Sequence, residues 1–164
     1  MEAFSLILLA ATLLCSLVAG FLFAYAVVVM PGLRAMSPAE YLRAFQAMDR
    51  VIQANSPPFV LVWAGSVVAI LAAAGAGYGR LEGLELGLLL GAAGVYLLGV
   101  QLPTFAFNLP LNNELKSLVV SDMEPSARES LRDAFEARWV VSNTARTLLA
   151  CVVVVLLLVV LQRT

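Results

Sequence analysis

Four long apolar runs alternate with polar segments along the chain. A transmembrane α-helix needs about 20 consecutive apolar residues, because the hydrocarbon core of a bilayer is about 30 Å thick. The pattern therefore predicts an all-α fold, a four-transmembrane-helix bundle that forms a single integral membrane domain over residues 1–164. The expected spans are residues 4–30, 58–78, 84–107 and 140–161.

The polar segment after the first run has the pattern of an amphipathic helix. Ser37 is a good N-cap, Pro38 fits the first turn, and Glu40 lies near the positive end of the helix dipole. Apolar residues then recur at helical spacing. We expect this helix to end near Asn55, before a double proline.

The segment before the fourth run also has a helical start, because Ser126 and Glu129 have the spacing of a capping box. No helix breaker follows, so we expect one helix from Ser126 to Gln162, roughly 55 Å long at about 1.5 Å per residue. This helix is too long for the bilayer alone, and its first third must project from it. Together with segment 37–55, it predicts amphipathic cytoplasmic helical extensions of the bundle.

Basic residues are distributed unevenly between the connections. The first and third connections carry Arg34, Arg43, Arg50, Lys116, Arg128, Arg132 and Arg138, whereas the opposite side carries Arg80 and Arg163. Since Lys and Arg concentrate in cytoplasmic loops, both termini are expected outside.

The third run contains small residues at intervals of four: Gly83, Gly87 and Gly91, with Gly94 nearby. Such spacing lets helices approach closely in lipid. We expect this face to be a packing seam, either within the bundle or between copies in a homo-oligomer.

The composition narrows the chemistry. The chain has no histidine, two cysteines and a net charge of −1. Histidine-held metal sites and haem are disfavoured, and we expect no metal. No long basic run suggests nucleic acid as a partner. The expected partners are the membrane and a lipophilic small molecule or lipid.

A polar cluster interrupts the start of the fourth run. Trp139, Asn143 and Arg146 fall on one helix face at about 100° per residue. The apolar residues after Arg146 are too few to span a bilayer, so Arg146 must lie inside the membrane boundary. An isolated arginine there costs roughly 2.5 to 3.5 kcal/mol, which favours a position facing the bundle interior.

Amides at the end of the third run are the nearest rich source of acceptors. Asn108 and Asn112 are four residues apart, and Pro103 and Pro110 predict a kink that frees carbonyl groups. We therefore expect a polar pocket around Arg146 between the third and fourth helices. The alternative is an arginine that snorkels to the headgroups and asparagines that only join helices.

Other polar and aromatic side chains in the runs have simpler interpretations. Hydroxyl and amide groups there are typical of helix contacts. This group comprises Ser66, Gln101, Thr104, Ser142 and Thr147. Tyr25, Trp63 and Tyr96 have the pattern of core or interface aromatics.

Three stretches resemble the DUF1772 family, also called anthrone oxygenase-like. They are "FNLPLNNEL" after the third run, "WVVSNTAR" at the start of the fourth, and "VMPGL" at the end of the first. Family members are small four-span proteins with N-x-P-x-N and W-x-x-x-N-x-x-R motifs in these places. The motifs correspond to Asn108, Pro110, Asn112, Trp139, Asn143 and Arg146.

The resemblance implies a candidate activity. Fungal members oxidise anthrones to anthraquinones without metal or flavin, so the resemblance implies no cofactor, whereas many bacterial members have no assigned role. A bacterial inner membrane is the expected location. By this resemblance Arg146, Asn112 and Asn143 are the candidate catalytic residues, and Asn108, Trp139 and Pro110 the substrate-binding ones.

A general base is not evident among these residues. Asp49 and Glu114 are the nearest acidic candidates. A non-catalytic protein that binds a lipid or quinone, or a subunit of a membrane complex, is therefore the alternative. A transporter is disfavoured, because the chain has no evident inverted repeat.

Overall fold

The protein is a bundle of four long helices, described by a computed structural model over residues 2–54 and 56–164. Throughout this part of the chain the regular structure is helical, which confirms the all-α prediction. Each long helix is apolar enough to cross a membrane, as expected of an integral membrane protein. These helices are Ala3–Arg34, Pro57–Tyr78, Gly83–Lys116 and Pro125–Arg163.

The first and third long helices are divided by wider turns. The first consists of α1 (Ala3–Ala24), the π-helical η1 (Tyr25–Val29) and α2 (Met30–Arg34). The third consists of α5 (Gly83–Val95), the π-helical η2 (Tyr96–Gln101) and η3 (Thr104–Asn108), and α6 (Leu109–Lys116). The others are α4 (Pro57–Tyr78) and α7 (Pro125–Arg163). The amphipathic helix α3 (Pro38–Gln53) and the 3-10 turn η4 (Val120–Asp122) lie in the connections.

The disturbance expected at Pro103 and Pro110 takes the form of π-helical turns. Proline lacks the N–H that an α-helix needs for its bond to the carbonyl four residues earlier. The backbone widens before each proline, over η2 and η3. Wider turns of this kind are frequent at functional sites.

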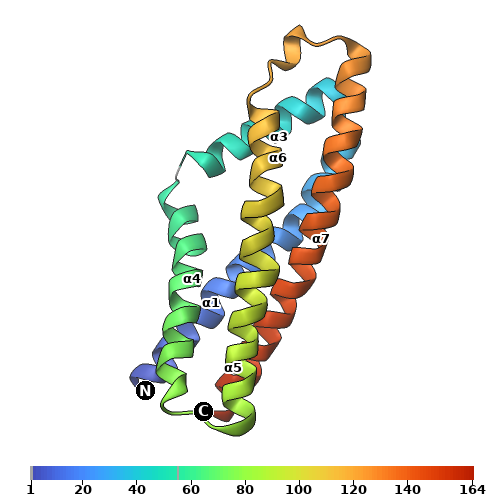
Figure 1. The fold of residues 1–164 in the computed structure, drawn as a ribbon. Coiled ribbons are helices and arrows are strands. Elements are labelled where there is room, and N and C mark those ends of the chain that lie inside the picture. Colours follow the sequence, from blue (N-terminus) through green and yellow to red (C-terminus); the bar gives the residue numbers. More distant parts are fainter. Residues whose placement is uncertain (1, 55) are drawn as a thin grey trace.

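Both termini lie at one end of the bundle, and α3 lies across the other (Figure 1). The middle of the bundle is packed around α1, whose Leu8, Ala11 and Val18 are fully buried against the other long helices. α4 and α5 form a helical hairpin. Its turn requires a glycine, since Gly83 has φ +55.

The glycine ladder does not form a seam within the chain. A Cβ added at Gly83, Gly87, Gly91 or Gly94 would meet no heavy atom of another described segment within 4 Å. The buried side of α5 instead carries Leu89, Ala92 and Ala93. The larger Leu89 side chain fills the space against Gly77, so the glycines point away from the core. Contact between copies through the ladder stays a prediction.

The capping prediction for α3 is confirmed, because Ser37 and Glu40 form a capping box at its start. Its expected end at Asn55 lies outside the described residues. The second predicted capping box is wrong. α7 begins at Pro125 with Glu124 as N-cap and no side-chain cap, because the fixed φ of proline suits the first helical position.

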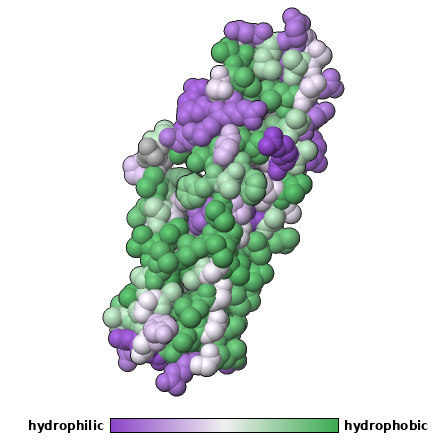
Figure 2. All heavy atoms as spheres, in the orientation of Figure 1, coloured by the Kyte–Doolittle hydropathy of each residue, from purple (hydrophilic) through white to green (hydrophobic). Residues whose placement is uncertain are grey.

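A second hydrophobic core joins α3 to the N-terminal part of α7. Here Tyr41, Leu42 and Phe45 of α3 are buried with Phe135 and Trp139 of α7. Hydrophilic residues gather at this end in the space-filling view, whereas the part between it and the lower tip is mostly hydrophobic (Figure 2). The two predicted extensions therefore pack on each other.

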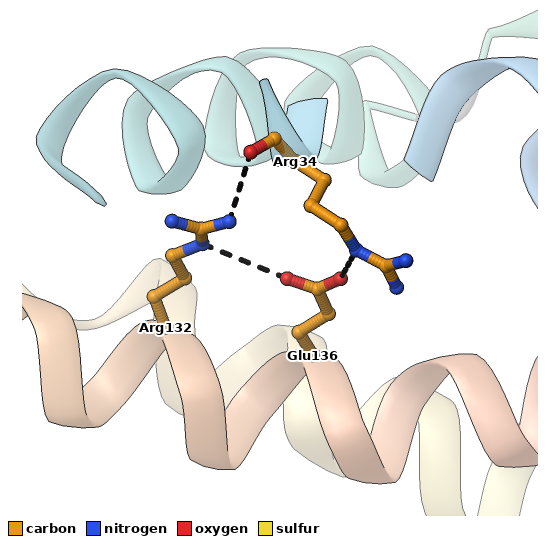
Figure 3. A network of polar contacts seen from close by, with 3 residues as sticks. All are labelled: Arg34, Arg132 and Glu136. Carbon is orange, nitrogen blue, oxygen red and sulfur yellow. Dashed lines mark hydrogen bonds and ion pairs between the residues drawn. The ribbon is translucent and has the colours of Figure 1, made fainter. Parts of the chain in front are cut away.

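An ionic network fixes this arrangement (Figure 3). Arg34 Nε donates to Glu136 Oε1 at 2.5 Å, and Arg132 Nε lies 3.6 Å from Glu136 Oε2. Arg132 also donates to the backbone oxygen of Arg34 at 3.0 Å and lies over the ring of Tyr41. One carboxylate thus joins the end of α2 to α7 close to α3.

We predict that Glu136→Gln lowers the free energy of unfolding by about 1 to 2 kcal/mol, because two arginines near a mostly buried position lose their counter-charge. Thermal unfolding of the detergent-purified protein measures the change. Glu2→Gln is the control, since its ion pair with Arg80 is exposed on both sides. Equal shifts in the two variants would contradict a special role for the network.

Candidate functional site

A cavity of about 350 Å³ lies below α3, between the four long helices. Its volume is within the range of small-molecule sites. Three kinds of side chain line it. The polar ones are Asp49, Gln53, Thr104, Asn108, Asn112, Asn143 and Arg146. The aromatic ones are Phe21, Tyr25, Phe45, Phe59, Trp63, Phe105 and Trp139. The aliphatic ones are Leu22, Ile52 and Leu109.

Arg146 is buried in the cavity wall, with only 3% of its surface exposed. Its Nη1 donates to Thr104 Oγ1 at 2.8 Å, and its Nη2 donates to Asn143 Oδ1 at 3.1 Å. Its Nε is buried without a partner. Among the described residues no carboxylate forms an ion pair with it. The charge is therefore held by neutral oxygen atoms, and snorkelling to solvent is not observed.

Asn143 connects this arginine to the first helix. Its Nδ2 donates to the backbone oxygen of Leu22 at 3.1 Å, close to the transition from α1 to η1. Its Oδ1 is thereby turned toward Arg146. Asn143 thus fixes the guanidinium relative to α1.

Asn108 and Asn112 line the same cavity as Arg146 but do not bond to it. Asn108 Oδ1 accepts from Ser142 Oγ at 2.5 Å, and Asn108 Nδ2 is buried without a partner. Asn112 accepts from Trp139 Nε1 at 3.0 Å and donates to Asp49 Oδ1 at 2.8 Å. The amides therefore join three helices around the cavity instead of enclosing the guanidinium.

Asp49 is the carboxylate of the cavity lining, and 3% of its surface is exposed. It accepts from Asn112 and from Gln53 Nε2, the latter at 2.6 Å. Burial raises the pKa of Asp49, although these hydrogen bonds and the charge of Lys116 oppose the rise. The other acidic candidate, Glu114, is exposed and does not line this cavity.

An aromatic wall faces these polar groups from α4 and α1. The rings of Phe59 and Trp63 are stacked, with centroids 5.4 Å apart and an interplanar angle of 21°. Phe21 meets both rings edge-on. Trp63 is fixed by a 3.0 Å hydrogen bond from its Nε1 to Gln101. Stacked and edge-on rings are the favoured geometries of aromatic pairs, and such a wall suits a planar ring.

Trp139 lines the cavity in a different way. Its ring lies 5.5 Å from those of both Tyr25 and Phe45, which hold it in place. Because its N–H is also bonded to Asn112, Trp139 is part of the wall next to Asp49.

The structure brings together five of the six predicted site residues: Asn108, Asn112, Trp139, Asn143 and Arg146. Pro110 instead lines an apolar groove of about 940 Å³ between the third long helix and α7. Arg146 borders this groove as well. Pro110 therefore shapes the helix that carries the asparagines and does not line the cavity.

Several lining residues were assigned by sequence to simple helix contacts. Thr104 binds Arg146 directly, and its position four residues before Asn108 is the signal that places it on the same face. Trp63 and Tyr25, which have the sequence pattern of core or interface aromatics, also line the cavity. Phe59 was not singled out, although its spacing to Trp63 also places the two rings on one face.

The donors of the cavity suit an organic ligand with acceptor atoms. Within the part of the chain that the structure describes, no group of three or more His, Cys, Asp and Glu residues could hold a metal ion. Arg146 and Asn108 each have a buried nitrogen without a partner. A buried unpaired donor costs about 1 to 3 kcal/mol, which a ligand oxygen could recover.

We predict that Asp49→Asn raises the melting temperature relative to the wild type at pH 8, and that the difference shrinks toward pH 4. A raised pKa means that the folded protein favours the protonated carboxyl, so wild-type stability falls as pH rises from the ordinary value of 3.8 through the folded value. Asparagine removes this penalty. Thermal unfolding of both proteins across this pH range measures the difference. A wild type with a higher melting temperature than Asp49→Asn at pH 8 would contradict the raised pKa of a buried carboxyl.

Comparison with known proteins is consistent with these findings. The sequence model of the anthrone oxygenase family matches residues 44–156, a range that contains Asp49, both motif segments and Arg146. Searches among curated proteins and among solved structures gave no match. Since the match covers more than half of the chain, the protein belongs to the anthrone oxygenase family.

Proposed function

We propose that the protein is an oxygenase that oxidises a planar, lipophilic anthrone- or quinol-like substrate in this cavity without a cofactor. The observation that carries the proposal is the placement of Arg146 and Asp49 in the walls of one apolar cavity. A fixed cation and a carboxylate with a raised pKa are the two groups that such a reaction needs.

The lining supports a particular orientation of the substrate. One face of the ring system would lie on the wall of Phe59 and Trp63, where it buries apolar surface. The oxygen substituents would point to the opposite side, toward Arg146 and Asn108. Their unpaired nitrogens would then acquire acceptors.

For an anthrone the reaction can be written in balanced steps. Asp49 removes a proton from the ring CH2, and the resulting enolate oxygen is stabilised by Arg146 in a low-dielectric site. The ring carbon donates its electron pair to O2, and the new C–O–O⁻ group takes the proton back from Asp49. Loss of the second C–H proton then breaks the O–O bond. The carbon becomes a carbonyl, and the departing hydroxide takes that proton to form water.

We predict that Arg146→Gln and Asp49→Asn each slow oxygen uptake with an anthrone by about 100-fold or more, the usual effect of losing a positioned charge or base. Purified protein in detergent and an oxygen electrode measure the rate. Arg138→Gln and Glu114→Gln are the matched controls, because both residues are exposed and lie outside the cavity lining. Equal losses in the controls, or unchanged rates in the cavity variants, would contradict the proposal.

The pH dependence provides a second prediction. A base works only when ionised, so the rate should fall as pH drops through the raised pKa of Asp49, above the ordinary aspartate value of 3.8. The expected profile of kcat/KM has its acidic limb above that value and is flat in Asp49→Asn. A wild-type rate that stays constant down to pH 4 would exclude Asp49 as the base.

Binding without turnover is the second candidate function. It is favoured by the unpaired donors of Arg146 and Asn108, since a quinone offers carbonyl acceptors but no acidic C–H. In that case the wild type should bind a quinone without oxygen uptake. Arg146→Gln should weaken this binding, whereas Asp49→Asn should leave it intact.

A further inference from the structure

The cavity has one side that α4 does not close. α4 packs against α1 and α5, but it has no extensive contact with η3 or α6. In Figure 1, α4 and α6 diverge toward the α3 end of the bundle. The cavity lining continues across this separation, from Phe59 and Trp63 on α4 to Phe105 and Leu109 on the third long helix. The surface is hollowed between these helices (Figure 2).

The end of the cavity beneath α3 is closed by hydrogen bonds between α3 and the end of the third long helix. Gln46 Nε2 donates to the backbone oxygens of Leu115 and Leu118 at 2.8 and 3.0 Å. Lys116 donates to Gln53 at 2.9 Å, and Asn112 donates to Asp49. Four hydrogen bonds thus join the two segments, and access between them would break these bonds.

The open side lies at the depth of the hydrocarbon edge. At 1.5 Å per residue, Trp63 is about 22 Å along α4 from Tyr78, and Phe105 is about 33 Å from Gly83. A hydrocarbon core of about 30 Å that starts at the α4–α5 turn therefore ends near these two rings. Phe105 is 60% exposed. Aromatic rings are typical of this depth.

We infer that the separation between Phe59 and Trp63 on α4 and Phe105 and Leu109 on the third long helix is the route by which ligand enters the cavity sideways from the bilayer. This inference rests on the proposed function, because it concerns the same cavity. It defines the substrate class more narrowly, as molecules that dissolve in the membrane edge with their polar groups at the level of Arg146. Charged, water-soluble analogues of the same ring system lack this route.

A reversible cross-link tests the route. Phe59→Cys and Phe105→Cys are combined in a chain with Cys15→Ala and Cys151→Ala, and the new thiols are joined by a cleavable bis-maleimide in phosphatidylcholine nanodiscs. The probe is 1,8-dihydroxyanthraquinone, whose binding quenches Trp63 and Trp139 in the cavity wall. Mass spectrometry confirms the link.

The link is made either before or after the probe is added. Linking before the probe is added should slow quenching on the order of tenfold or more, and linking afterwards should slow release of bound probe by a similar factor. Cleavage of the linker should restore both rates in the same sample. The control link joins Tyr78→Cys and Leu84→Cys, exposed residues at the far end of α4 and α5, and should change neither rate.

The outcomes separate the inference from the proposed function. Unchanged rates in the linked protein, with normal quenching, would overturn the lateral route and leave the binding cavity intact. Slower quenching in the linked protein that cleavage does not reverse would also overturn it, because the change would then come from modification of the thiols and not from closing the separation. Absence of quenching in the wild type would instead contradict the proposed function, and the lateral route would fail with it.

Discussion

The structure depends on one constraint, which is a guanidinium charge inside the edge of a membrane bundle, with no carboxylate partner among the described residues. Arg146 is held by a threonine hydroxyl and an asparagine oxygen, and one of its nitrogens is unpaired. Such a charge is costly in an apolar setting, so the surrounding helices supply oxygen atoms at the positions where it needs them. The π-helical turns before Pro103 and Pro110 lie in the segment that presents Thr104 and Asn108.

Helix α3 covers one end of the cavity and completes the site. It is held by an apolar core with α7 and by the network around Glu136, and it carries Asp49 to the wall of the cavity. Asn112 joins this carboxylate to Trp139, so the acid, the indole and the third long helix form one bonded unit. An acid and a cation are thereby placed around a space lined by aromatic rings. This separation of charges suits a substrate that must lose a proton and carry negative charge on oxygen.

Much of this arrangement was predictable from local patterns. Apolar length gave the four spans, and a helical period of 3.6 residues placed Trp139, Asn143 and Arg146 on one face. The choice between Asp49 and Glu114 was not predictable, because it depends on how α3 docks onto α6. The aromatic wall was missed for a similar reason, since the edge-on contact of Phe59 with Phe21 joins two helices distant in sequence. The glycine ladder and the Ser126 cap were plausible local patterns. In the structure, Leu89 and not the glycines of the ladder packs against the core, and α7 begins at Pro125 without a side-chain cap.

The most direct test of the central claim is the fate of oxygen atoms in a single turnover. Purified protein in nanodiscs is given an anthrone under oxygen-18 gas, and the product is analysed by mass spectrometry. The account predicts one labelled oxygen atom in the new ring carbonyl of the quinone and the other in water, at a rate well above that of protein-free nanodiscs. A quinone without the label, or formation no faster than in empty nanodiscs, would show that the cavity does not perform this chemistry.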